Sequence, residues 1–172
     1  MSSSSSEGYY LGIDLGTQGL SVILTDTDLH VVATGDASYD FCPNQLGCYE
    51  QNAKDWESAL QQAMKVVLDK MNSTTVDIVA IGIAGQMHGE VLVNEQDQVL
   101  TPVRLWCDAR NEQEGHLLTE HFQTKVPKRA TVARFLWTIR NRPDIARQVR
   151  HLTTPAGWIA FCLTGEWNLG TK

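Results

Sequence analysis

Residues 12–26 read GIDLGTQGLSVILTD, and this stretch decides the fold that the sequence predicts. The apolar run Tyr9–Asp14 ends in an acid, a glycine-bearing turn follows at Leu15–Gly19, and a second apolar run occupies Leu20–Thr25. Two β-rich runs joined by a glycine-containing turn predict a β-hairpin. A third strand is expected from His30 onward, so the chain should begin as a meander of antiparallel strands.

Further along the chain the hydrophobic pattern changes from strand to helix and back. Asn52 is a good N-cap, and apolar residues from Trp56 to Met71 recur at helical spacing. The nearly continuous apolar run Val76–Ala84 is typical of a strand buried on both faces in a parallel sheet. Short strands are expected at Glu90–Val93 and Gln98–Trp106.

The last third of the chain is predicted to be helical. Helices are expected at Ala109–Phe122, Thr131–Arg140, Asp144–Val149 and Thr154–Leu163, the last with Thr154 as N-cap and Pro155 at the first helical position. Strands followed by a helix, more strands and several helices indicate an α/β class. The length of 172 residues is typical of one domain.

Composition excludes several classes of protein. Twenty acidic and 14 basic residues give a net charge of −6, which argues against a nucleic-acid binder. No apolar run approaches the roughly 20 residues of a membrane span. Residues 1–8 are serine-rich, lack the pattern of a signal peptide, and are expected to form a disordered tail. Cys42, Cys48, Cys107 and Cys162 show no C-x-x-C spacing, so we expect neither a metal site nor disulfides, but reduced thiols in a cytoplasm.

The segment Gly12–Gly19 is the strongest chemical signal in the sequence. Glycines let backbone N–H groups approach a phosphate closely and tolerate positive φ, and the carboxylate of Asp14 beside them could hold Mg²⁺ through water. The segment is not a P-loop, since it lacks Gly-Lys-Ser/Thr, and it is not a dinucleotide fingerprint, which needs a helix after the glycines. An ordinary hairpin in which Asp14 satisfies turn amides is the alternative.

A second polar segment, Gly85-Gln86-Met87-His88-Gly89, follows the buried run directly. Open α/β sheets place ligands at the carboxyl ends of such strands, and the imidazole of His88 can both donate to and accept from sugar hydroxyls. Taken alone, a loop histidine bonded to the backbone is the favoured interpretation.

The third segment is Trp106-Cys107-Asp108-Ala109-Arg110. Asp108 could accept hydrogen bonds from hydroxyls with Arg110 steadying it, but its position favours an N-cap for the helix that follows. The basic cluster Lys125–Arg134 is interpreted as a solvated helix entry rather than an anion site. Trp56, Trp137 and Trp158 are expected in the core because of their helical placement.

Together and in this order, these segments resemble a known family. The stretches GIDLGTQGLSVILTD, IVAIGIAGQMHGEVLVNEQDQVLTPVRLWCDAR and TPAGWIAFCLTGEWN resemble the N-terminal domain of the FGGY carbohydrate kinases, and the Gln-Met-His-Gly segment is most like the xylulokinase group. The resemblance covers about Tyr9–Gly170. It implies a ribonuclease-H-like fold of the actin/hexokinase type, a mixed sheet flanked by helices, here incomplete at its C-terminus.

The resemblance also implies an activity and its residues. Family members transfer the γ-phosphoryl group of ATP, with Mg²⁺, to a sugar hydroxyl, here that of a ketopentose or related sugar. Asp14 would lie at the phosphate and Mg²⁺ site, with the metal bound through water. The phosphate loop would comprise Gly16, Thr17 and Gln18, and the sugar contacts would be Met87, His88, Asp108 and Arg110. A cytoplasmic location and a homodimer of the full-length protein are further expectations, with neither nucleic acid nor membrane as partner.

The sequence departs from the family in two respects. Cys107 stands where an amide side chain is usual and Ala109 where glycine is common, which affects the choice of sugar. The family's Gly-Gly-Asp-Asn-like segment, which carries the general base, does not occur in this chain. Residues 9–172 are therefore expected to be a truncated N-terminal domain that lacks the second nucleotide-binding domain and is inactive by itself. The alternatives are a non-catalytic sugar- or partner-binding module and, less favoured, an actin- or Hsp70-like ATPase fragment.

Overall fold

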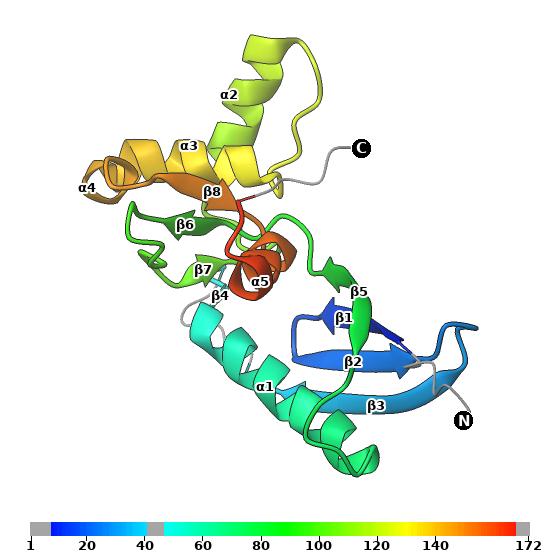
Figure 1. The fold of residues 1–172 in the computed structure, drawn as a ribbon. Helices are drawn as coiled ribbons and strands as arrows, with labels where there is room; N and C mark the ends of the chain where they lie inside the picture. Colours follow the sequence, from blue (N-terminus) through cyan, green and yellow to red (C-terminus); the bar gives the residue numbers. More distant parts are fainter. Residues whose placement is uncertain (1–7, 41–46, 168–172) are drawn as a thin grey trace, which may run out of the picture. The chain divides into compact units, whose positions relative to one another are not determined.

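The computed structural model describes residues 8–40 and 47–167, which form two compact units. Unit 1 is the described part of Met1–Asp40 and Lys54–Gly85, and unit 2 is the described part of Phe41–Ala53 and Gln86–Lys172 (Figure 1). The predicted tail, except for Gly8, lies outside the described residues, as does Cys42. Cys48, Cys107 and Cys162 form no disulfide among the described residues.

Unit 1 contains a four-stranded mixed sheet. Its strands are β1 (Tyr9–Leu15), β2 (Gly19–Thr25), β3 (Val31–Ser38) and β5 (Ile78–Gly85), in the order β3-β2-β1-β5. The first three strands pair antiparallel, which confirms the predicted meander, and β5 pairs parallel to β1. Side chains alternate along β1 and β2, so every second residue enters the core.

Helix α1 (Ala53–Lys70) packs against one face of this sheet and begins directly after Asn52, as predicted. A Cβ at Gly35 of β3 would lie 2.1 Å from the carbonyl oxygen of Ala63, so only glycine admits the helix at this distance. At the other end of α1, Lys70 donates to the carbonyl of Thr34 over 2.8 Å. The apolar face of α1 is buried as its spacing predicts, with Trp56 fully inaccessible.

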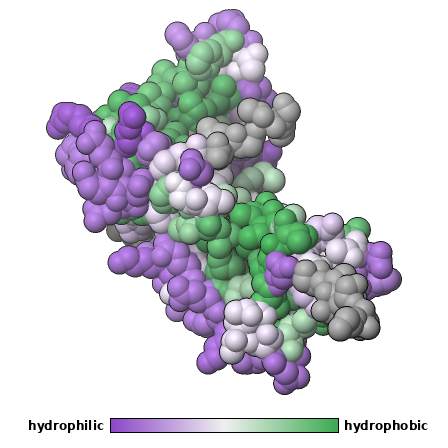
Figure 2. Space-filling view, viewed as in Figure 1, coloured by the Kyte–Doolittle hydropathy of each residue, from purple (hydrophilic) through white to green (hydrophobic). Residues whose placement is uncertain are grey.

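The prediction that Val76–Ala84 is buried on both faces was wrong. The parallel pairing of β5 with β1 is present, but β5 is the last strand of the described sheet and has no described neighbour on its other side. Val79 is 56% exposed and Ile81 44% exposed, and Figure 2 shows apolar surface over β5. An apolar run predicts burial only when neighbouring elements cover both faces.

Unit 2 consists of short strand pairs and helices. Its strands are β4 (Glu50–Gln51), β6 (Val91–Val93), β7 (Val103–Arg104) and β8 (His151–Thr153), and its helices are α2 (Glu112–Phe122), α3 (Thr131–Asn141), α4 (Pro143–Ala146) and α5 (Pro155–Thr164). β4 pairs with β7 and β6 with β8, both antiparallel. The strand expected over Gln98–Trp106 is reduced to β7 and one bridge at Val99, and β4 and β8 were not predicted.

The helices of unit 2 lie close to their predicted positions, although α2 starts three residues later and α4 ends three residues earlier than predicted, and α3 buries polar side chains. Thr154 caps α5 by accepting from the N–H of Gly157 over 3.3 Å, as predicted. On α3, Arg134 and Thr138 are buried, whereas Val132 is 50% and Ile139 46% exposed. Among the helices of residues 8–40 and 47–167, none combines the length and apolar content needed to cross a bilayer.

Candidate functional site

The turn that follows β1 is held by a tyrosine at the far end of β3. The hydroxyl of Tyr39 lies 2.5 Å from the carbonyl oxygen of Gly16 and 3.0 Å from that of Gly19. The N–H of Tyr39 donates to the carbonyl of Gln18 over 3.2 Å. Burial, reinforced by the charge of Asp14, raises the pKa of Tyr39, so its hydroxyl keeps its proton as a donor. Tyr39 therefore holds the turn that was predicted as a phosphate loop. No local sequence pattern indicates this role of Tyr39.

Close packing accounts for the glycines of this turn. Neither Gly16 nor Gly19 has a positive φ, so the predicted need for a left-handed backbone at these glycines does not apply. A Cβ at Gly19 would lie 2.9 Å from the carbonyl oxygen of Ala37, and one at Gly16 would lie 3.1 Å from that of Gly19. A side chain at Gly19 would therefore force the backbone to shift, and one at Gly16 would fit only if the carbonyl of Gly19 moved slightly.

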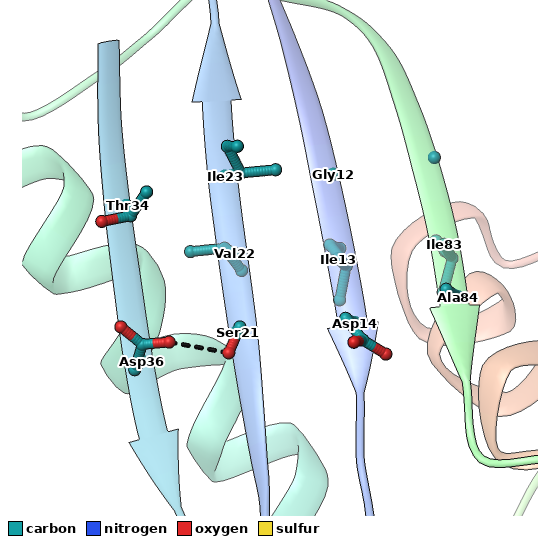
Figure 3. A pocket seen from close by; sticks show the side chains of 11 residues that line it. Gly12, Ile13, Asp14, Ser21, Val22, Ile23, Thr34, Asp36, Ile83 and Ala84 are labelled. Carbon is teal, nitrogen blue, oxygen red and sulfur yellow. Dashed lines mark hydrogen bonds between the residues drawn. The ribbon is translucent and has the colours of Figure 1, made fainter. Parts of the chain in front are cut away.

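The sheet face opposite α1 carries a hollow of about 690 Å³ beside Asp14. Asp14, Ser21 and Asp36 lie in one row across β1, β2 and β3, because Asp14 pairs with Ser21 and Ser21 with Asp36. Ser21 donates to Asp36 over 2.7 Å, and Figure 3 shows this bond on the floor of the hollow. The sequence did not predict a role for Asp36 or Ser21. Both lie at exposed positions of strands whose side chains alternate between the core and the opposite face.

Apolar side chains and glycines form most of this hollow, but its polar residues suit a hydrated divalent cation. Carboxylate and hydroxyl oxygens from Asp14, Asp36, Ser21 and Thr34 line it, and no basic side chain does. Mg²⁺ prefers oxygen ligands and keeps several waters when bound by one or two carboxylates. Two strand spacings separate Asp14 from Asp36 by about 10 Å, so both reach one ion only through water. Within the described part of the chain, no three His, Cys, Asp or Glu residues form a metal cage.

In unit 2, the buried Asp108 and the partly buried Arg110 form an ion pair. The carboxylate of Asp108 has no exposed surface, and Arg110 Nη2 lies 2.7 Å from it and 2.6 Å from Glu50. Asp108 also accepts from the N–H of Tyr49 over 3.0 Å. Burial alone would raise the pKa of Asp108, but the bonds from Arg110 and Tyr49 outweigh it and lower that pKa. Burial lowers the pKa of Arg110, and its bonds to Asp108 and Glu50 more than reverse this.

Asp108 does not cap the next helix, so that prediction was wrong. Helix α2 begins at Glu112, and Asn111 stands at its N-cap position without a side-chain cap bond. Both oxygens of Asp108 are instead engaged by Arg110, and one of them also by Tyr49. The bond from Tyr49, the residue before β4, comes from 59 positions away, which no local pattern reveals.

His88 and Met87 lie in the turn after β5. Met87 is 62% exposed, and His88 has a left-handed backbone with φ of 61°. The carbonyl of His88 accepts from Arg134 Nη1 over 2.9 Å, while its imidazole has no hydrogen-bond partner among the described residues. Burial, with the charges of Arg129 and Arg134, lowers the pKa of His88, so the imidazole is neutral near pH 7 and can both donate and accept.

Arg134 links the second and third segments of the sequence analysis. This fully buried side chain also donates to the carbonyl of Trp106 over 2.8 Å. The interpretation of the basic cluster as a solvated helix entry holds for Lys125, Lys128 and Arg129, which are exposed, but was wrong for Arg134. Burial, together with the neighbouring charge of Arg104, lowers the pKa of Arg134 to about 10.

The two groups of predicted residues belong to different units. Asp14 and the turn Gly16–Gln18 lie in unit 1, and the predicted sugar contacts, Met87 through Arg110, lie in unit 2. Within unit 1, the parallel strands β1 and β5 end level with each other, since Leu15 pairs with Gly85. The chain therefore leaves the same edge of the sheet into the Gly16 turn and into Gln86.

A mixed sheet in the order β3-β2-β1-β5, with a helix against one face, defines a ribonuclease-H-like domain of the actin/hexokinase type. A family model described as the FGGY family of carbohydrate kinases, N-terminal domain, matches residues 9–171. The chain belongs to this family.

Similar proteins agree with this assignment. The xylulose kinase of Escherichia coli K12 is 35% identical over 169 residues, and that of Haemophilus influenzae 31% over 173, each alignment covering 92% of this chain. The crystal structure of a xyloylose kinase from Brucella ovis has a TM-score of 0.84 at 30% identity and covers 92% of this chain and 34% of that one. The chain spans about a third of the length of the curated relatives, 34% and 35% for the two named here.

Proposed function

We propose that this chain is the N-terminal portion of an ATP-dependent sugar kinase that phosphorylates a ketopentose such as xylulose. The observation that carries the proposal is the shared sheet edge, where β1 leads into the Gly16 turn and β5 leads into Gln86. Ligands of α/β sheets bind outside the carboxyl ends of their strands. The identities of 31–35% to xylulose kinases support the choice of sugar.

On the phosphate side, Asp14 and the turn it precedes would do the binding. Asp14 is exposed, and Tyr39 bonds to the carbonyls of Gly16 and Gly19 and so braces the turn. The N–H of Gly16 donates to the carbonyl of Gly19 over 2.9 Å, so the phosphate would be bound through Asp14 and the part of the turn beyond Gly16. The oxygen donors of the hollow fit Mg²⁺, with Asp14 binding it through water. When bound, Mg²⁺ neutralises charge on the transferring phosphate.

On the sugar side, the neutral imidazole of His88 would bind a sugar hydroxyl as both donor and acceptor, with the exposed Met87 beside it. Asp108 is wholly buried and engaged, so its part in this proposal is to hold the guanidinium of Arg110 in place. Arg110 keeps 27% of its side chain exposed and presents the polar group of this pair.

Phosphoryl transfer works by positioning both substrates and stabilising charge. We infer that a general base and an adenine site come from residues outside this chain, since the chain spans about a third of its relatives. By itself it should bind sugar weakly and transfer no phosphate. A cytoplasmic location and a homodimer of the whole protein are part of the same proposal.

The test combines sugar binding with an assay for ADP release. Titration of the chain with D-xylulose by calorimetry should give saturable binding that His88→Ala abolishes. The matched control His116→Ala, an exposed histidine on α2, should leave binding unchanged. A coupled assay with D-xylulose and MgATP should detect no ADP. Turnover at the rate of an ordinary kinase would refute the inferred need for further residues, and equal binding by both variants would refute the role of His88.

One observation favours a second candidate, a non-catalytic partner-binding module. Apolar side chains of β5 and α3 are exposed, including Val79, Ile81 and Val132. Exposed apolar patches mark interaction surfaces. Saturable sugar binding in the wild-type chain, together with kinase activity once the missing portion of the protein is supplied, favours the kinase. Sugar binding without activity in the whole protein favours the module.

A further inference from the structure

We propose that Arg134 of α3 is a positioning residue of the sugar site, which holds the turn at His88 and the segment Trp106–Arg110 in fixed places relative to each other. The inference rests on the proposed function, because it concerns the same sugar site. All of these residues belong to unit 2. Arg134 has no exposed surface, so it acts through the two segments and does not touch the sugar itself.

The guanidinium of Arg134 bonds to both segments at once. Its Nη1 donates to the carbonyl of His88 over 2.9 Å, and its Nη2 donates to the carbonyl of Trp106 over 2.8 Å. Nη1 also donates to the carbonyl of Arg129, which precedes α3. A guanidinium is planar and rigid, and its donors point in fixed directions. The two carbonyls that it bonds are therefore set at one distance from each other, and the segments that carry them are set with them.

The backbone at His88 needs such a bond. His88 has a φ of 61°, in the left-handed region that costs free energy for residues other than glycine and persists where the surroundings hold it. Arg134 holds the carbonyl of this residue. The next residue is held from another side, because a Cβ at Gly89 would lie 2.6 Å from the ring of Pro155 in α5. The turn is thus tied to α3 and packed against α5, which fixes where the imidazole of His88 projects.

The charge of Arg134 has a second effect on the same imidazole. Burial, with the charges of Arg129 and Arg134, lowers the pKa of His88 and keeps the ring neutral. Burial, more than the charge of Arg104, lowers the pKa of Arg134 to about 10, so Arg134 is still charged at pH 7. Its Nε is buried without a hydrogen-bond partner in the described part of the chain. A side chain that only filled space would avoid both costs, and the carbonyls that Arg134 holds account for the arginine.

The experiment follows His88 by NMR and measures the affinity for D-xylulose by calorimetry. His88→Ala identifies the His88 signal among the five histidines. In the wild-type chain the imidazole should titrate below its ordinary pKa of 6.5. Arg134→Met keeps most of the volume but has neither charge nor donor. It should raise the pKa of His88 toward 6.5 and weaken sugar binding about tenfold, the worth of one charge-assisted hydrogen bond.

Arg134→Lys separates charge from geometry and serves as the test if the methionine variant does not fold. Lysine keeps the charge but replaces the planar fork with a single ammonium group. The pKa of His88 should therefore stay lowered. The amide signals of Gly89 and Cys107, whose nitrogens adjoin the two bonded carbonyls, should both shift. Sugar affinity should fall about threefold, as expected for one weakened hydrogen bond.

The matched control is Arg140→Met on the same helix. It removes an arginine that lies 3.1 Å from the buried Glu114, so it should also lower stability. It should leave the pKa of His88, the two amide signals and the sugar affinity as in the wild type. A thermal unfolding scan of each variant shows which temperature keeps all of them folded.

Two results would overturn the positioning role. One is an unchanged amide signal at either Gly89 or Cys107 in Arg134→Lys, because Arg134 would then not hold both segments. The other is the same set of changes in Arg140→Met, which would trace them to lost stability alone. A failure of the proposed function looks different: the wild-type chain would bind no D-xylulose, while the NMR changes at His88, Gly89 and Cys107 would still support the role of Arg134.

Discussion

The two units of this protein both bury aliphatic side chains, but among the described residues the buried polar and charged ones all belong to unit 2. In unit 1, the residues with least exposure are aliphatic, such as Leu15, Leu20 and Leu24, each at 1% or less. In unit 2, Val91 and Leu105 are buried to the same degree, but so is Arg134 at 0%, and Asp108 is at 2%. A sheet can bury a regular apolar stripe, whereas irregular segments without long strands leave backbone groups that need side-chain partners.

This difference determines how each unit tolerates substitution. Apolar burial is non-directional, so side chains of similar volume can replace one another at small cost. A buried guanidinium bonded to backbone carbonyls acts through fixed geometry, and its loss leaves those carbonyls without partners. Volume-conserving substitutions should therefore be tolerated at the aliphatic positions of unit 1 and not at the buried polar positions of unit 2, such as Arg134.

Substitution of Arg134 should have the largest effect. Arg134→Ala removes the donor to the carbonyls of His88, Arg129 and Trp106 and leaves a cavity, so we expect a loss of about 4 kcal/mol in the free energy of unfolding. Arg134→Met restores most of the volume but should recover less than half of this loss. Urea unfolding measures both, with Arg129→Ala, an exposed arginine, as control. Full recovery by methionine would show that volume alone matters at this position.

Leu24 in β2 provides the opposite case. Leu24→Ala should cost about 3 kcal/mol, because it empties a fully buried position, whereas Leu24→Met should cost less than about 1.5 kcal/mol. Leu29→Ala, at a position 69% exposed, serves as the control and should change stability little. The same urea series measures all three. A methionine at position 24 as damaging as alanine would erase the proposed distinction between the units.

The smallest of the three effects depends on pH. The pKa of Asp108 is lowered in the folded chain, so its contribution is present above the unfolded pKa of about 3.9 and is lost as pH falls through the folded value. Asp108→Asn should lower the free energy of unfolding by about 2 kcal/mol at pH 7. The difference in stability between the variant and the wild type should become smaller below pH 4. Thermal unfolding between pH 7 and pH 3 tests this, with the exposed Asp28→Asn as control. A difference in stability that does not change with pH would contradict a stabilising contribution from the charge of Asp108.

The sequence predicted unit 1 better than unit 2. Alternating apolar residues and a glycine turn specified the β1–β2 hairpin, and helical spacing specified α1, because these signals are local. The buried face of α3 could not be predicted, since Arg134 and Thr138 are buried through carbonyl and carboxylate partners from other elements. For the same reason Tyr39, which holds the predicted phosphate turn from 20 or more residues away, gave no signal.

Strand β5 has a consequence for how the chain behaves at high concentration. It forms the edge of the described sheet, and it is parallel, eight residues long and rich in exposed aliphatic side chains. Such an edge presents unpaired backbone groups to any other extended chain, and neither charge nor proline interrupts Ile78–Gly85. Self-association by strand addition should therefore increase with protein concentration. The substitution Ile81→Lys would place a charge in this strand and should reduce that self-association.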